Sequence, residues 1–192
     1  MRIISGKYKG LRLYFSKTEK LRPTADRVKE SLFNIINDSI SEALVLDLFA
    51  GTGSLGYEAY SRGAKKVVLV DIDDKVLKKN LMLLMQKDAQ DVQSKIKVIK
   101  APFFRFLKQN TTKFDLIFID PPWNKISYYD DALKAISEFD ILAPEGLICL
   151  EHRKNIIIQP NFPLLRFIDS YHYGDTCLTI LKKLTAKNKA ND

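Results

Sequence analysis

Cysteine and histidine are scarce in this chain of 192 residues, which has two of each. Cys149 and Cys177 lie in apolar stretches without metal-ligand spacing, so the sequence predicts buried free thiols in a reducing compartment, and hence a cytoplasmic protein. His152 and His172 are far apart and have no cluster of Cys or His around them. We therefore expect neither a metal site nor a nucleophilic triad built on histidine.

Long hydrophobic runs are also missing. No stretch approaches the roughly 18 apolar residues that a membrane-spanning helix needs, and no apolar h-region follows the basic N-terminus as it would in a signal peptide. The 46% hydrophobic content is nevertheless sufficient for a packed core, and the length suits one domain. We expect a globular protein that is not associated with membranes and that is a monomer by default.

Apolar runs alternate with segments of helical periodicity, which is typical of an α/β fold with a mostly parallel sheet. An N-terminal hairpin is expected at 2–5 and 11–15, followed by a helix from Thr24 or Asp26 to about Asn37 that buries Val28, Leu32, Phe33 and Ile36. Pro144-Glu145-Gly146 is expected to be the turn before the fifth strand, and Gly174 joins two final strands, 164–171 and 176–184. The remaining strands are expected near 44–49, 67–71, 96–100, 114–119 and 146–151, and helices near 54–62, 74–86, 102–109 and 129–138.

Glycines follow the first of these strands in a pattern typical of nucleotide-binding turns. Gly51 and Gly53 permit a tight turn and a close approach of backbone to a ligand. Asp71, at the end of the next strand, is placed to accept hydrogen bonds from ribose hydroxyls. Asp47 would repel the pyrophosphate of a dinucleotide but suits the ammonium and sulfonium of S-adenosylmethionine. The alternative is that Asp47 is a structural carboxylate that caps nearby backbone N–H groups.

The segment Asp120–Trp123 (DPPW) follows the apolar run 114–119 and therefore lies at the end of a buried strand where ligands bind in open α/β sheets. Its prolines have no N–H to donate, so the segment offers carbonyl and carboxylate acceptors, which suit the two hydrogens of an aromatic amine. The Trp123 ring offers a face for stacking a base. An ordinary turn after a strand is the alternative, since Asp and Pro are common turn residues.

Positive charge is concentrated at the N-terminus. Residues 1–29 hold nine Lys or Arg against two acids, whereas the other 163 residues hold 22 basic and 21 acidic groups. A phosphate backbone would attract such a segment, and a small metabolite would not need it. The alternative is a solvated basic hairpin that only aids solubility. The candidate RNA-binding residues are Arg2, Lys7, Lys9, Arg12, Arg22 and Arg27.

From Arg2 to about Leu184 the chain resembles the S-adenosylmethionine-dependent RNA methyltransferases of the RsmD type. The resemblance is carried by six segments: Arg2–Gly10, Leu21–Asn34, Asp47–Gly56, Asp71–Asp73, Asp120–Trp123 and Tyr173–Thr176. The Arg22-Pro23-Thr24 block favours this family over DNA methylases. Three positions depart from the family pattern: Trp123 in place of the more usual Phe, Asp71 in place of Glu, and Pro102 where a polar residue near the adenine is usual.

The resemblance implies a Rossmann-like class I methyltransferase with a seven-stranded sheet, mostly parallel, that has an antiparallel strand near the C-terminus. We expect one domain, 1–184, comprising the basic hairpin and helix (1–38) and the Rossmann-like core (39–184), with a disordered tail at 185–192. The implied catalytic residues are Asp120, Pro121, Pro122 and Trp123, and the implied S-adenosylmethionine-binding residues are Asp47, Phe49, Ala50, Gly51, Thr52, Gly53, Asp71 and Ile72.

The implied reaction is methylation of the exocyclic N2 of a guanine in 16S ribosomal RNA, either free or within the small ribosomal subunit or an assembly intermediate. Guanine is specified by the resemblance alone, because adenine and cytosine also carry exocyclic amines. Amino-methylation of DNA adenine or cytosine, or of a ribosomal protein, is the alternative. A non-catalytic nucleic-acid-binding module is disfavoured, because the acidic and glycine residues expected to bind the cofactor and the amine are all present: Asp47, Gly51, Gly53, Asp71 and Asp120.

Overall fold

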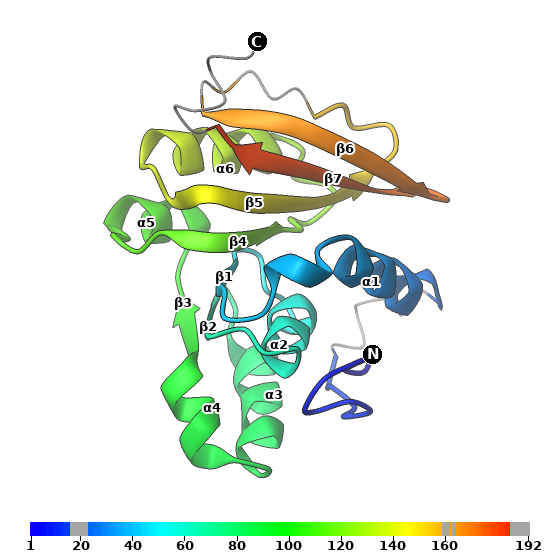
Figure 1. Ribbon diagram of the computed structural model, residues 1–192, viewed down its shortest axis with the longest axis vertical. Coiled ribbons are helices and arrows are strands. Elements are labelled where there is room, and N and C mark those ends of the chain that lie inside the picture. The colour runs from blue at the N-terminus through cyan, green and yellow to red at the C-terminus, as the bar shows by residue number, and fades with distance from the viewer. Residues whose placement is uncertain (16–22, 159–161, 163, 185–192) are drawn as a thin grey trace.

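A mixed sheet of seven strands forms the centre of the computed structural model, which describes residues 1–15, 23–158, 162 and 164–184 (Figure 1). The strand order is β3-β2-β1-β4-β5-β7-β6. Neighbouring strands from β3 to β5 are parallel, whereas β7 runs antiparallel to both β5 and β6. This confirms the predicted sheet. The strands are β1 (Leu44–Asp47), β2 (Lys66–Asp71), β3 (Ile96–Lys100), β4 (Phe114–Ile119), β5 (Leu142–Arg153), β6 (Leu165–Tyr173) and β7 (Thr176–Lys183).

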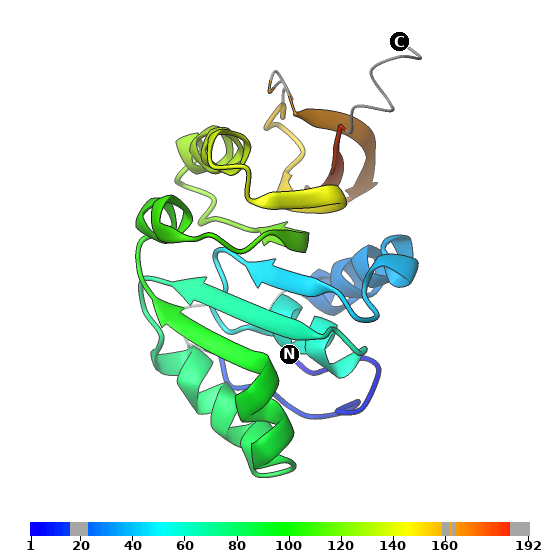
Figure 2. The same ribbon diagram turned by 60° about the vertical axis from the view of Figure 1, so that its left-hand side comes forward.

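Helices cover both faces of the sheet. One core cluster joins one face to the N-terminal segment and α1–α4, and the other cluster joins the opposite face to α5 and α6. Figure 2 shows α5 and α6 on one side of the strands and α1 on the other. The helices are α1 (Pro23–Ile35), α2 (Ser54–Ser61), α3 (Lys75–Met85), α4 (Ala89–Lys95), α5 (Phe103–Gln109) and α6 (Ser127–Glu138), and a 3-10 turn, η1 (Asn37–Ser39), follows α1. No helix in these described ranges is both long and apolar enough to cross a bilayer.

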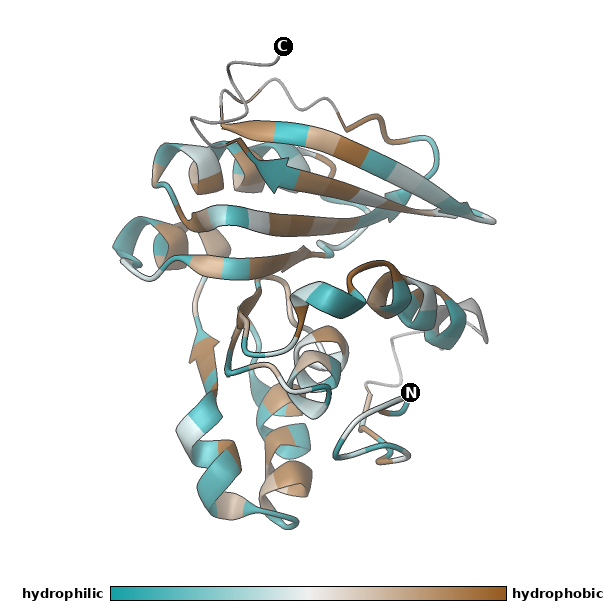
Figure 3. Cartoon of the chain, viewed as in Figure 1, coloured by the Kyte–Doolittle hydropathy of each residue, from teal (hydrophilic) through white to brown (hydrophobic). Residues whose placement is uncertain are grey.

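The central strands are mostly apolar because both of their faces are covered. Successive residues of β4 alternate between the two clusters: Leu116 and Phe118 face α1–α4, and Ile117 and Ile119 face α5 and α6. The hydropathy colouring shows the resulting hydrophobic bands along the central strands (Figure 3). The strand direction changes from near vertical at β3 to near horizontal at β5–β7, which reflects the twist of the sheet (Figure 1).

Several predicted boundaries are wrong. The helix α4 was not expected, and the strand expected at 146–151 is longer, because β5 continues through Pro144–Gly146 as an irregularity opposite Asp115. The expected N-terminal strands are replaced by turns and one antiparallel bridge between Arg2 and Arg12. α1 ends at Ile35 rather than near Asn37. The four residues predicted to be buried are all buried, but Ile36 lies just beyond the end of the helix. The tail at 185–192 lies outside the described residues.

The order of the strands reverses between β1 and β4, because the chain builds outward from β1 through β2 to β3 and then returns to β4 on the other side. At such a switch point the loops that follow the two strands diverge, which leaves room for a ligand. The glycine-containing turn follows β1 and the segment Asp120–Trp123 follows β4. The fold therefore brings the two predicted motifs to the same edge of the sheet on neighbouring strands.

Candidate active site

The turn between β1 and α2 is fastened to the end of β2. Gly51 and Gly53 have φ angles of 54° and 80°. A Cβ on Gly53 would lie 2.3 Å from the ring of Tyr57, so only glycine fits there. The N–H of Gly51 donates to Oδ2 of Asp71 at 2.7 Å. Of the other predicted cofactor residues in this turn, Ala50 and Thr52 are buried and Phe49 is half-buried.

Asp47 is a buried carboxylate at the end of β1, with an exposed fraction of only 2%. Its Oδ2 accepts the N–H of Gly56 at 3.0 Å, so the alternative role of capping α2 backbone is present in the structure. Burial, together with the nearby charge of Asp71, raises the pKa of Asp47 to about 7. A carboxylate held this way still favours a cation beside it, so capping and cofactor binding are compatible.

Asp71 and Ile72 form the rim of this site at the end of β2. Besides the Gly51 N–H, the Asp71 carboxylate accepts the N–H of Asp73 at 3.0 Å. Ile72 leaves 71% of its surface exposed although it is a large apolar residue. Two carboxylates and an exposed apolar side chain suit a ligand that has cationic, hydroxyl and aromatic parts. The residues present therefore fit S-adenosylmethionine, and they would repel a pyrophosphate.

Three aromatic rings gather between the glycine-containing turn and α6. The ring of Phe49 lies 5.0 Å from that of Phe103 and is stacked on Tyr128 at 5.9 Å, and Phe103 lies 5.1 Å from Tyr128. Phe103 begins α5 and follows Pro102, whose side chain is exposed. Only Phe49 was expected at the site. Phe103 and Tyr128 are distant from it in sequence, and no local pattern marks them.

Asp120–Trp123 extends from the end of β4. Asp120 and Trp123 are half-buried, Pro121 is buried and Pro122 is exposed. The carbonyl of Pro122 accepts the N–H of Lys125 at 2.8 Å, which closes a turn before α6. The ring of Trp123 has a partner that the sequence did not predict, because the guanidinium of Arg153 lies 4.4 Å from its centroid.

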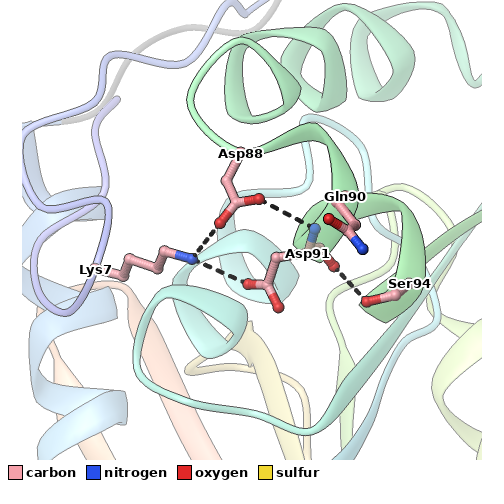
Figure 4. A pocket seen from close by; sticks show the side chains of 5 residues that line it. All are labelled: Lys7, Asp88, Gln90, Asp91 and Ser94. Carbon is pink, nitrogen blue, oxygen red and sulfur yellow. Dashed lines mark hydrogen bonds and ion pairs between the residues drawn. The ribbon is translucent and has the colours of Figure 1, made fainter.

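The predicted RNA-binding residues occupy different environments. Lys7 is engaged within the protein: its ammonium lies 2.8 Å from Asp88 and 3.1 Å from Asp91, and these carboxylates hold its pKa well above the usual value (Figure 4). The same three residues line a pocket of about 420 Å³ with Gln90 and Ser94. Lys7 thus attaches the hairpin to α4, a role that sequence reasoning missed.

A wider groove of about 570 Å³ opens beside the hairpin and the junction of α3 and α4. Lys9 and Arg12 line it and are exposed, and Lys87 adds a cation that was not predicted. Arg2 is exposed on the hairpin and Arg27 on α1. Arg22 lies outside the described residues.

The hairpin is attached to the glycine-containing turn and to α2 through buried polar residues. The carboxylate of Glu58 in α2 accepts the N–H groups of Ile4 and Ser5 at 2.7 and 3.0 Å. The fully buried amide of Asn80 in α3 bonds both backbone groups of Tyr14 and donates to the Thr52 carbonyl at 2.9 Å. Neither residue was predicted, because each acts through contacts distant in sequence.

Several relatives are similar to this chain in sequence over most of their length. The protein named "Ribosomal RNA small subunit methyltransferase D" from Haemophilus influenzae is 41% identical over 173 residues, covering 86% of each chain. The "Putative rRNA methyltransferase YlbH" of Bacillus subtilis is 36% identical and covers 95% of this chain and 99% of its own. The family model described as "Conserved hypothetical protein 95" matches residues 1–182.

The chain belongs to the RsmD-type methyltransferase family. The fold agrees: a solved structure of the "Putative methyltransferase yhhF from Escherichia coli" superposes with a TM-score of 0.79 at 28% identity, covering 95% of this chain and 97% of that one. The family consists of S-adenosylmethionine-dependent methyltransferases, so the predicted fold, family and cofactor are confirmed. The roles of individual residues remain predictions.

Proposed function

We propose that this RsmD-type protein methylates the exocyclic N2 of a guanine in 16S ribosomal RNA. The observation that carries the proposal is the placement of Asp120–Trp123 beside the glycine-containing turn, at the ends of the neighbouring strands β4 and β1. The relatives named as small-subunit ribosomal RNA methyltransferases support this choice of substrate. A ribosomal substrate implies action in the cytoplasm.

The cofactor is held by the turn and by two carboxylates. When bound, S-adenosylmethionine supplies a methyl group on a positively charged sulfur. Asp47 attracts the ammonium of its methionine portion, and backbone of Ala50, Gly51 and Gly53 lies against that portion. Asp71 accepts hydrogen bonds from the ribose diol. Ile72 covers the adenine, and Phe49 with its aromatic neighbours borders the same region.

The target amine is held by acceptors. The Asp120 carboxylate and the Pro121 carbonyl accept the two amine hydrogens, and Pro122 keeps the turn rigid. The base stacks on Trp123, after leaving any duplex in which it is paired. This arrangement directs the nitrogen lone pair out of conjugation with the ring. Orienting the reactants in this way lowers the activation barrier by an amount on the order of several kcal/mol. As positive charge develops on nitrogen, Asp120 stabilises it and accepts the proton.

The groove beside the hairpin binds RNA phosphates. Lys9, Arg12 and Lys87 supply its cations, while Arg2 and Arg27 extend the basic surface. Lys7 contributes less, because two carboxylates already neutralise it. These cations would anchor a large substrate through its phosphates.

Transfer of labelled methyl from S-adenosylmethionine tests this proposal. Unmethylated small ribosomal subunits, free 16S ribosomal RNA and duplex DNA are compared under the same conditions. We expect label as N2-methylguanine in the ribosomal RNA, and the ratio of rates on subunits and free RNA shows which form is the substrate. Label only in DNA or in a ribosomal protein would refute the proposed substrate and leave the family and cofactor unchanged.

A further inference from the structure

Arg153 contacts the only tryptophan of the chain, Trp123. Its guanidinium carbon lies 4.4 Å from the centroid of the Trp123 ring. At that distance a planar guanidinium stacks on the ring by a cation–π contact, and the N–H groups along its edge are directed away from the ring face. The contact therefore places a permanent cation over one face of the ring on which the target base is proposed to stack, and the base would use the other face.

The backbone of Arg153 is fixed, so this cation is projected from a rigid position. Arg153 is the last residue of β5 and pairs with Thr176 of β7. Its carbonyl accepts the N–H of Ile156 at 3.0 Å and lies 2.9 Å from Nδ1 of His152. Side chains anchored on strand ends hold functional geometry better than those on loops.

The sheet register places Arg153 close to Asp120. Ile119 of β4 pairs with Leu150 of β5, so Asp120 and Glu151 are the next residues along the two strands. Glu151 and Arg153 are two residues apart, and side chains at this spacing share one face of a strand. All three charges affect the pKa of the buried Tyr129 hydroxyl. Burial, Asp120 and Glu151 raise this pKa, and Arg153 lowers it.

We propose that Arg153 positions the target nucleotide by binding its phosphate while its guanidinium stacks on Trp123. A stacked base carries its sugar and phosphate beside the ring edge, where the N–H groups of the guanidinium are displayed. Arginine suits this role because its planar donors match two phosphate oxygens at once. This inference rests on the proposed function, and it assigns recognition of the backbone at the reacting nucleotide to a residue outside the Asp120–Trp123 segment.

Two substitutions separate the charge of Arg153 from its shape. Arg153→Gln removes the charge, and Arg153→Lys keeps the charge but loses the planar donors. Arg166→Gln is the matched control, because Arg166 is an exposed arginine on β6 at the far edge of the sheet. For each variant we would measure methyl transfer to the RNA substrate established for the wild type, the salt dependence of RNA binding, and the fluorescence of Trp123 during RNA titration. S-adenosylhomocysteine affinity and the thermal midpoint serve as folding controls.

We expect Arg153→Gln to lower kcat/KM for RNA by about tenfold or more, the loss typical of a hydrogen bond to a charged group. Its salt dependence should fall by about one phosphate contact, and S-adenosylhomocysteine affinity should be unchanged. Arg153→Lys should keep the wild-type salt dependence but bind RNA more weakly, with less complete quenching of Trp123. Arg166→Gln should match the wild type in kcat/KM.

The inference is overturned if Arg153→Gln retains the wild-type salt dependence and kcat/KM, or if Arg166→Gln shows an equal loss. A change in the fluorescence of the free protein without any change in RNA binding would show that Arg153 only supports the Trp123 ring, and would also overturn it. Failure of the proposed function is distinguishable, because the wild type would then not methylate RNA at all.

Discussion

Glu58 provides the sharpest test of how the hairpin is held. Its carboxylate is fully buried and accepts hydrogen bonds from the N–H groups of Ile4 and Ser5 and from the Nε of Arg62 at 2.8 Å. It also forms an ion pair with the ammonium of Lys29 at 3.6 Å. Lys29 is itself only 4% exposed. Burial lowers the pKa of Lys29, and the Glu58 charge is the main influence that opposes this shift.

The variant Glu58→Gln keeps the shape of the side chain but removes the charge. Breaking a buried ion pair by removing one partner costs about 3–5 kcal/mol, because the other charge remains buried. Total stabilities are commonly about 5–15 kcal/mol, so the loss should be easily measured. We expect urea denaturation to show a decrease in the free energy of unfolding in this range, with faster hydrogen exchange at Ile4 and Ser5.

A double-mutant cycle with Lys29→Met identifies the cause of this loss of stability. If the uncompensated charge of Lys29 is responsible, the double variant Lys29→Met/Glu58→Gln should be more stable than the sum of the two single losses indicates, by about 0.5–3 kcal/mol. Glu138→Gln, an exposed residue of α6, is the control and should stay within about 0.5 kcal/mol of the wild type. A loss below about 1 kcal/mol for Glu58→Gln, or additivity in the cycle, would refute the reasoning.

Three further predictions concern the site. Asp120→Ala should abolish methyl transfer while S-adenosylhomocysteine affinity, measured by isothermal titration, stays close to wild type; lost binding in a folded variant would instead assign Asp120 to the cofactor. Burial raises the pKa of Asp47 to about 7 in the free protein, and only its ionised form attracts the ligand's ammonium. Affinity for S-adenosylhomocysteine should therefore fall by up to about tenfold per pH unit as the pH drops below about 7, and it should be constant above that pH. The variant Asp47→Asn should remove this pH dependence. If the variant keeps the wild-type pH dependence, Asp47 does not bind the ammonium. Replacing the groove cations together (Lys9→Gln, Arg12→Gln, Lys87→Gln) should weaken RNA binding and lower its salt slope by about two to three. Lys7→Gln should change the slope less, because Lys7 is already paired, and equal effects would show that its ion pairs open for RNA.

The sequence predicted elements whose signals are local. The apolar runs of β3 and β4 have the bounds that were expected. α1 buries Val28, Leu32 and Phe33 at helical spacing, and Ile36 is buried just after its end. The helix α4 escaped prediction because Val92 is its only buried residue, so it lacks an apolar period. The segment Pro144–Gly146 carries strong turn signals, but the pairing of β5 with β4 on both sides of it keeps it within the strand.

By itself the sequence determined the family and the cofactor, because their motifs are made of neighbouring residues. It also determined the edge of the sheet where the motifs meet, because parallel strands share one carboxyl edge. Only the tertiary structure decided which cationic side chains are available to bind RNA. Lys7 is neutralised by Asp88 and Asp91, more than 80 residues away, and Arg153 is stacked on Trp123. Burial in the folded protein raises the pKa of Asp47, and folding brings the Glu58 carboxylate to the backbone N–H groups of the hairpin. Burial and pairing depend on groups that the fold brings together over long separations, which no local pattern encodes.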